Sequence, residues 1–161
     1  MEHWSEQDVG ILTGRVGPWR SLAAGRKVLV LEDDLCLKTM LTRLLQMIDP
    51  NMEILWKTTG DQAIEDLNHH LKSEGNPYDL VIADISTPGE RSGLDFWQLC
   101  RLRFPKMAFL FISSMPVDRF LKTLGSNMLC PPFLPKPFTV GECRQIVEGL
   151  LRYSEKDDDS S

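Results

Sequence analysis

Five short apolar runs, each followed by apolar residues at helical spacing, most constrain the fold of this 161-residue chain. Continuous apolar runs of this length are typical of strands that are buried on both faces of a sheet. Strands that alternate with helices predict an α/β fold, a doubly wound five-stranded parallel sheet with helices on both faces. The expected strands are residues 28–31, 52–57, 80–83, 108–112 and 133–134, and the expected helices cover about 37–48, 63–71, 94–102, 117–124 and the residues after 139.

Polar residues indicate where two of these helices begin. Residues 59–62 and 139–142 both start with threonine and end with glutamine or glutamate, which is the pattern of a capping box. Phe138 and Cys143 are spaced to form a hydrophobic staple across the second box.

Composition divides the chain into three parts. Residues 1–25 have no sustained periodicity and are predicted to be an N-terminal extension, whose Trp4 and Trp19 either anchor a partner or fold back onto the domain. Residues 26–153 are predicted to form one globular domain, because 42% hydrophobic and 25% charged residues suit a chain of this length with a sizeable core. Residues 154–161 are acidic and are predicted to be a disordered tail.

Charge and cysteine usage exclude several function classes. A net charge of -5 argues against a nucleic-acid partner, which requires a basic face. No apolar run approaches the ~20 residues that span a bilayer, and no secretory signal precedes the domain, so we expect no membrane partner and a cytoplasmic location. The cysteines lack a Cys-x-x-Cys pair and are expected to be small buried residues, not zinc ligands or disulfides. They are Cys36, Cys100, Cys130 and Cys143.

Charged residues follow three of the predicted strands. Asp84 ends the third apolar run, residues 32–34 (Glu-Asp-Asp) end the first, and Lys136 follows the last. Because the carboxyl ends of parallel strands meet in one crevice, we expect these groups to build a single site. The first turn has carboxylates where a dinucleotide-binding fold has glycines, so it is suited to a cation and not to phosphate.

Grouped carboxylates need a neutralising partner. Two like charges 4 Å apart repel by about 1 kcal/mol in water and about 4 kcal/mol at an effective dielectric constant of 20. Magnesium prefers oxygen ligands and is typically bound by one or two carboxylates, so Glu32, Asp33 and Asp84 are candidate ligands. The Asp84 carboxylate is also able to attack phosphorus, while a metal ion and the Lys136 ammonium stabilise the transition-state charge.

Four segments in order along residues 26–153 resemble the receiver domain of response regulators in two-component signalling: 28–34, 84–89, 113–114 and 136–138. This resemblance implies a flavodoxin-like fold in which Asp84 accepts a phosphoryl group. It implies that Glu32, Asp33, Asp84 and the backbone carbonyl of Ser86 bind Mg²⁺. Lys136 and Ser113 would assist the reaction.

The resemblance also implies a conformational switch and partners. Ser113 and Phe133 stand where the family has its switch hydroxyl and aromatic residue, and the Lys136–Pro137 bond is cis in the family. A histidine kinase or phosphotransfer protein would be the phosphoryl donor. A downstream protein would bind the face made by the fourth helix, the fifth strand and the fifth helix.

Each candidate also has a structural explanation. Acids at positions 32–34 suit a helix N-terminus, and Asp84 and Lys136 could respectively cap a turn or face solvent. The Ser113 hydroxyl could satisfy backbone groups at a strand end, and Phe133 could be core packing. His69 and His70 are expected to face solvent.

The chain departs from the family pattern at several places. Phe133 replaces the commoner tyrosine, and the turn 88–93 is one residue longer than usual. Extra residues lie between positions 125 and 136, the helix near 116–124 is short, and the second helix is expected to extend through 69–74.

The expected function is that of a stand-alone, non-enzymatic receiver, because little sequence follows Tyr153. One alternative is a receiver-like scaffold that binds its partner without phosphorylation. Another is a phosphohydrolase with an aspartate nucleophile, similar to haloacid-dehalogenase-like enzymes. Those enzymes place a second acid two residues after the nucleophile, where this chain has Ser86.

Overall fold

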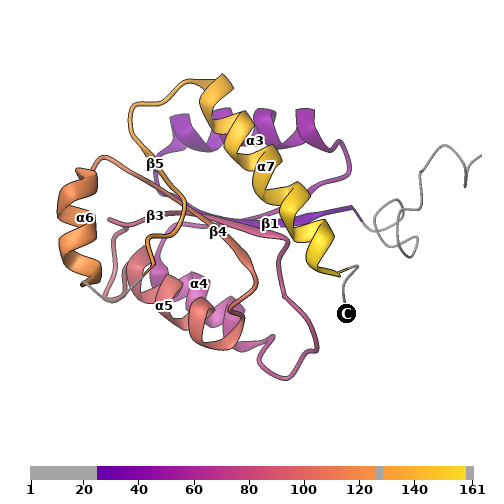
Figure 1. Cartoon of the computed structure of the whole chain (residues 1–161), viewed down its shortest axis with the longest axis horizontal. Coiled ribbons are helices and arrows are strands. Elements are labelled where there is room, and N and C mark those ends of the chain that lie inside the picture. Colours follow the sequence, from indigo (N-terminus) through magenta and orange to yellow (C-terminus); the bar gives the residue numbers. More distant parts are fainter. Residues whose placement is uncertain (1–24, 126–128, 159–161) are drawn as a thin grey trace, which may run out of the picture.

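A computed structural model describes residues 25–125 and 129–158, with side chains described as far as Tyr153. Strands and helices alternate along the chain (Figure 1). The elements are β1 (Lys27–Leu31), α3 (Leu35–Ile48), β2 (Glu53–Lys57), α4 (Gly60–Asn68), β3 (Leu80–Asp84), α5 (Gly93–Arg103), β4 (Ala108–Ser113), α6 (Val117–Leu124), β5 (Phe133–Pro135) and α7 (Val140–Asp158).

The five strands form one parallel sheet in the order β2-β1-β3-β4-β5. Helices α3 and α7 cover one face, and α4 and α5 cover the other (Figure 1). This arrangement confirms the doubly wound, flavodoxin-like fold predicted from the alternation of apolar runs and helical segments. Among the described residues, no helix is long and apolar enough to cross a bilayer.

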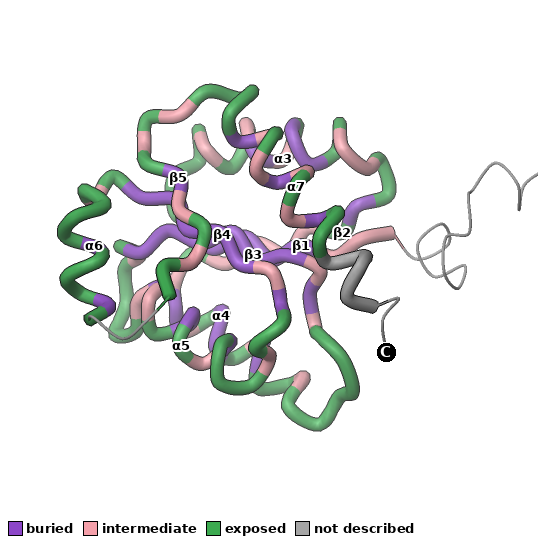
Figure 2. The backbone as a smooth tube through the Cα atoms, viewed as in Figure 1, coloured by how far each residue is buried: buried purple, intermediate pink, exposed green. Residues whose placement is uncertain are grey.

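The strands lie at the centre of the molecule, where many of their residues are buried (Figure 2). Strand side chains contribute to both apolar cores. In β1, Leu29 and Leu31 pack toward α4 and α5, whereas Val28 and Val30 pack toward α3 and α7. All four side chains are fully buried. Successive strand residues point to opposite faces, so a strand covered on both sides must be apolar at every position.

Local capping explains where the helices begin. The reciprocal capping box predicted at α7 is present, because Thr139 and Glu142 each accept a hydrogen bond from the other's backbone N–H. At α4 only half of the predicted box forms: Thr59 caps Gln62, but the Gln62 side chain accepts from Thr58 instead. A further capping box, Ser92 with Asp95, begins α5 and was not predicted from the sequence.

Helix α4 is shorter than its sequence pattern indicates. It ends at Asn68, so the predictions that it includes Leu71 and extends through residues 69–74 are wrong. Leu67 is buried, but Leu71 is 40% exposed and packs on no core. The apolar spacing continues beyond the last buried residue of the helix, whereas burial of an apolar face is what stabilises a short helix.

Other boundaries also differ from expectation. Helix α7 continues past Tyr153 to Asp158, into the segment predicted to be a disordered tail. Cys100 and Cys143 are buried as predicted, but Cys36 and Cys130 are exposed, and all four thiols are free. His69 is exposed, whereas His70 is half-buried beside Asp66 and the Tyr78 ring. The expectations for Trp4 and Trp19 lie outside the described residues.

Candidate functional site

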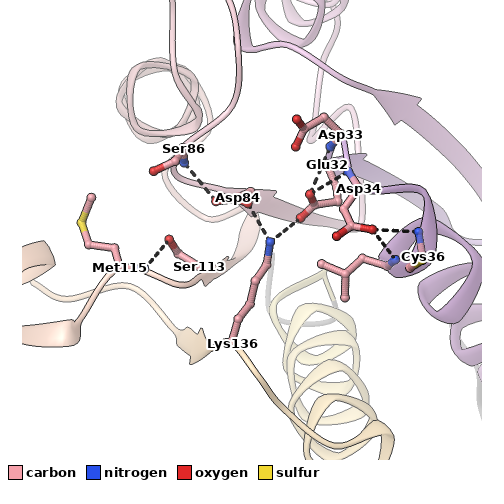
Figure 3. A network of polar contacts seen from close by, with 10 residues as sticks. Glu32, Asp33, Asp34, Cys36, Asp84, Ser86, Ser113, Met115 and Lys136 are labelled. Carbon is pink, nitrogen blue, oxygen red and sulfur yellow. Dashed lines mark hydrogen bonds and ion pairs between the residues drawn. The ribbon is translucent and has the colours of Figure 1, made fainter.

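Strand register brings the predicted site residues together. Leu31 pairs with Ala83, so the next residues along β1 and β3, Glu32 and Asp84, lie side by side at the carboxyl edge of the sheet. Lys136, directly after β5, extends between them (Figure 3). Its Nζ donates to Asp84 Oδ2 at 2.7 Å and to Glu32 Oε2 at 2.9 Å. The predicted convergence of acids from two strands with one lysine is therefore present.

These charged groups are shielded from water. Glu32 is 2% exposed and Asp84 is 7% exposed, while the Lys136 side chain is 19% exposed. The other Glu32 oxygen, Oε1, accepts from the backbone N–H groups of Asp33 and Asp34. Two buried carboxylates share one ammonium, so the cluster keeps an excess negative charge when all three groups are ionised. Such an excess favours a bound cation.

The electrostatic environment shifts two of the pKa values. Burial raises the pKa of the Glu32 carboxyl, and the hydrogen bond from Lys136 only partly offsets this effect. For Lys136, burial acts to lower the pKa, but the hydrogen bonds to Asp84 and Glu32 outweigh it, so the pKa is raised. Lys136 is therefore a stable cation at neutral pH, and its charge is available to a developing anion.

A divalent cation fits the oxygen atoms of this cluster. Glu32, Asp33 and Asp84 each offer a carboxylate oxygen, and these atoms lie within 4.8 Å of one another. Asp33 is exposed, so one side of the group is open for ligand entry. Hard carboxylate oxygens are the donors that Mg²⁺ prefers. Asp34 serves a different purpose, because its side chain caps α3 by accepting from Cys36 and Leu37.

Ser86 and Ser113 flank Asp84 on the side away from Glu32 (Figure 3). The Ser86 N–H donates to Asp84 Oδ1 at 3.0 Å, which fixes the second oxygen of that carboxylate. Ser113 is 1% exposed, and its hydroxyl oxygen accepts from the Met115 N–H. The structural explanation for this hydroxyl, a backbone contact at a strand end, therefore holds in this conformation. Its proton remains able to donate elsewhere.

Phe133 lies in an aromatic group at the β5 edge of the sheet. Its half-buried ring stacks on Phe120 of α6 with centroids 5.0 Å apart, and Phe120 in turn contacts Phe111. Core packing thus accounts for Phe133 in this conformation. The Lys136–Pro137 bond is cis, as the resemblance implied.

Two residues that contact or belong to the loop after Asp84 were not predicted from the sequence. Asp61 of α4 accepts backbone hydrogen bonds from Glu90 and Arg91, and Thr87 has a buried hydroxyl with no partner among the described residues. The Asp61 contacts join positions 29 and 30 residues apart, and no local pattern predicts such a pairing. Asp61 matches only the preference for acids in a first helical turn.

The chain is similar to a curated protein in sequence and to solved receiver domains in fold. No protein-family model matches the chain. Over 132 residues it is 26% identical to the alkaline phosphatase synthesis transcriptional regulatory protein PhoP of Bacillus subtilis (strain 168), a match covering 81% of this chain and 50% of that protein. The chain therefore spans about half the length of this curated relative.

Solved structures show the same fold. A response regulator receiver protein from Sinorhizobium medicae WSM419 superposes with a TM-score of 0.63 at 23% identity, covering 83% of this chain and 99% of that one. A CheY-like receiver domain protein from Methanospirillum hungatei JF-1 gives 0.62 at 16% identity, covering 82% and 98%. The class defined by the fold is the parallel α/β receiver. The chain thus has the fold of the response-regulator receiver domains that it resembles.

Proposed function

We propose that this receiver accepts a phosphoryl group on Asp84 in a Mg²⁺-dependent reaction and signals by binding another protein. The observation that carries the proposal is the contact of Lys136 with both Asp84 and Glu32 at the edge of the sheet. These two carboxylates and Asp33 are the three candidate metal ligands. Receiver domains use such a cluster to control protein interactions and are not enzymes in the usual sense.

The residues of the chain can be given separate roles. Asp84 is oriented through both oxygens, by Lys136 on one side and the Ser86 N–H on the other. A carboxylate oxygen forms a bond to phosphorus as the donor's phosphorus–nitrogen bond breaks, and the leaving nitrogen keeps the electron pair and is protonated. Lys136 stabilises the charge on the phosphoryl oxygens.

A bound Mg²⁺ would neutralise charge on the phosphoryl oxygens. Glu32, Asp33 and Asp84 would bind it through carboxylate oxygens, and the backbone carbonyl of Ser86 would be a further ligand. Together with Lys136, the ion would make a third anionic group acceptable beside two buried carboxylates.

The signal would reach the β5 edge through Ser113 and Phe133. A phosphoryl group adds about -1.5 to -2 charges and three acceptor oxygens, to which the Ser113 hydroxyl proton can be donated. Movement of the Ser113 side chain toward the phosphoryl group would replace its contact with the Met115 N–H. It would also alter the packing of Phe133 on Phe120. A downstream protein that binds α6, β5 and α7 would then distinguish the two forms.

The donor would be a histidine kinase or phosphotransfer protein in the cytoplasm. PhoP is a transcriptional regulatory protein, and the match to this chain covers 50% of it. We propose that this chain signals through a protein partner, without contact to nucleic acid or membrane.

The direct test is labelling with phosphoramidate and Mg²⁺, read by intact mass. Wild type should gain one phosphoryl group, and chelation of Mg²⁺ with EDTA should prevent the gain. Asp84→Asn should gain none, whereas the matched control Asp118→Asn, at an exposed position of α6, should label like wild type. An unlabelled wild type would contradict the proposal.

A phosphorylation-independent scaffold is the second candidate. It is favoured by one observation, the packing of Phe133 against Phe120 without a hydroxyl group that seeks a new partner. Equal affinity of the downstream partner for labelled and unlabelled protein would support it. The phosphohydrolase alternative predicts turnover of phosphate monoesters, which we do not expect because Ser86 occupies the position of the second acid.

A further inference from the structure

We propose that Asp61 is a positioning residue for the loop after the phosphoacceptor, residues 85–92, and thereby sets the affinity of the site for Mg²⁺. This inference rests on the proposed function, because the loop carries Ser86, whose carbonyl is the proposed additional metal ligand. Asp61 lies in the first turn of α4, outside the group of residues that touch Asp84.

The Asp61 carboxylate binds the far half of this loop. Its Oδ2 accepts from the backbone N–H of Glu90 at 3.1 Å and is 3.4 Å from the N–H donor of Arg91. Asp61 is not needed to cap its own helix, since Thr59 does so. Its contacts therefore lead away from α4, across to a loop 29 residues further along the chain.

Two glycines allow this close approach. A Cβ atom on Gly60 would lie 2.2 Å from the Arg91 carbonyl oxygen, so any larger residue there would push the loop away from α4. Gly89 has a φ of +108°, and a Cβ atom on it would lie 2.7 Å from Asp61 Oδ2. The loop and the start of α4 thus fit each other through backbone proximity, and the carboxylate supplies the hydrogen bonds.

The near half of the loop is bound to the site itself. The Ser86 N–H donates to Asp84, and the Gly93 N–H closes the loop by donating to the Ile85 carbonyl. Loss of the Asp61 contacts would let the chain between these two attachments adopt other conformations. A displacement at Glu90 would therefore move Ser86 relative to the carboxylates of the metal site.

The resemblance to receiver domains implies that the turn within this loop, residues 88–93, is one residue longer than usual, which would give the contacts a purpose. A longer turn has more conformations, and fixing its middle removes them. Asp61 offers a fixed acceptor from a rigid helix, whereas a loop side chain would itself have to be ordered. This arrangement makes the backbone of Ser86 a preorganised ligand.

The experiment compares Asp61→Ala, Asp61→Asn and the control Glu65→Ala, which removes the same charge from an exposed position of α4. Mg²⁺ affinity is measured by calorimetry, and the initial rate of phosphoramidate labelling by mass spectrometry. Asp61→Ala should raise the Kd for Mg²⁺ about tenfold, the lower end of the loss seen when a partner behind a metal ligand is removed. It should also slow labelling. Asp61→Asn keeps an acceptor oxygen and should lie between Asp61→Ala and wild type.

The outcomes separate this inference from the proposed function. If wild type labels but Asp61→Ala binds Mg²⁺ like wild type and Glu65→Ala, the inference is overturned and the proposed function stands. If wild type binds Mg²⁺ but does not label, the proposed function fails, and the Mg²⁺ titration still decides the role of Asp61. If Asp61→Ala does not fold, Gly89→Ala, which crowds the same contact, should raise the Kd, and an unchanged Kd would overturn the inference.

Discussion

Two neighbouring regions of this receiver are built by different forces. The charged cluster of Glu32, Asp84 and Lys136 is bound by directional hydrogen bonds of 2.7 and 2.9 Å between ionised groups. The aromatic group of Phe111, Phe120 and Phe133 is packed with ring centroids 5.0 and 5.2 Å apart. Directional bonds fix where a reacting group sits, whereas dispersion contacts favour close packing and accept more than one arrangement.

The two regions are joined through the backbone. The Lys136 N–H donates to the Ser113 carbonyl at 2.8 Å, so the residue that contacts Asp84 also continues the short strand that carries Phe133. A change in charge that moves Lys136 can therefore reach Phe133 through the backbone of this short strand. Under the proposed function, the reaction takes place in the first region and the conformational response in the second.

The largest effect on stability is expected in the aromatic group. Phe120 is fully buried, and Phe120→Ala should lower the free energy of unfolding by about 3 to 5 kcal/mol through the cavity it leaves. Urea denaturation measures this change, with exposed Leu121→Ala on the same helix as the control. Mg²⁺ affinity should be unchanged, and a large loss of affinity would break the division between the two regions.

For Lys136→Met we expect a slightly smaller decrease in the free energy of unfolding, and this decrease should depend on pH. This change leaves Glu32 and Asp84 buried without their cation and should cost about 3 kcal/mol near neutral pH. Burial already raises the pKa of Glu32, so protonation of this carboxyl stabilises the folded state. That contribution to the free energy of unfolding is lost as the pH rises through the raised pKa. The cost of Lys136→Met should therefore shrink as pH falls, as measured by urea denaturation between neutral and acidic pH. A pH-independent cost would show that lost packing, not charge, is responsible.

A loss of about 1 kcal/mol is expected for Phe133→Leu, because the ring is half-buried and only its stacking on Phe120 is removed. Phosphoramidate labelling should proceed at the wild-type rate. The affinity of a downstream partner for the labelled form is the informative measurement. If that affinity and its dependence on labelling are both unchanged, Phe133 is core packing and not a switch.

The last prediction is a gain in stability, of about the same size as the loss expected for Phe133→Leu. Thr87 has a buried hydroxyl without a hydrogen-bond partner among the described residues, and Thr87→Val keeps the shape while removing this polar group. The free energy of unfolding should rise by about 1 kcal/mol. Thr123→Val is the control, because the Thr123 hydroxyl is exposed and donates to Arg119, so no gain is expected there. A loss of stability in Thr87→Val would show that the hydroxyl is bonded in solution.

Much of the fold could be predicted because local and tertiary preferences agree. The apolar run before Asp84 is buried at every position, as a central parallel strand requires, and α6 lies where its short periodic segment indicates. The prediction failed where they disagree. Leu71 continues the helical spacing of α4, but its side chain is 40% exposed, and the helix ends before it.

By itself, the sequence determined which residues end the strands, and the parallel topology then required Glu32, Asp84 and Lys136 to meet, because the carboxyl ends of parallel strands share one edge. Only the tertiary structure decided that one ammonium contacts both carboxylates and that Asp61 binds the loop beyond Asp84. These contacts depend on strand register and on backbones close enough to touch. Both are properties of the packed chain, which no local pattern of residues encodes.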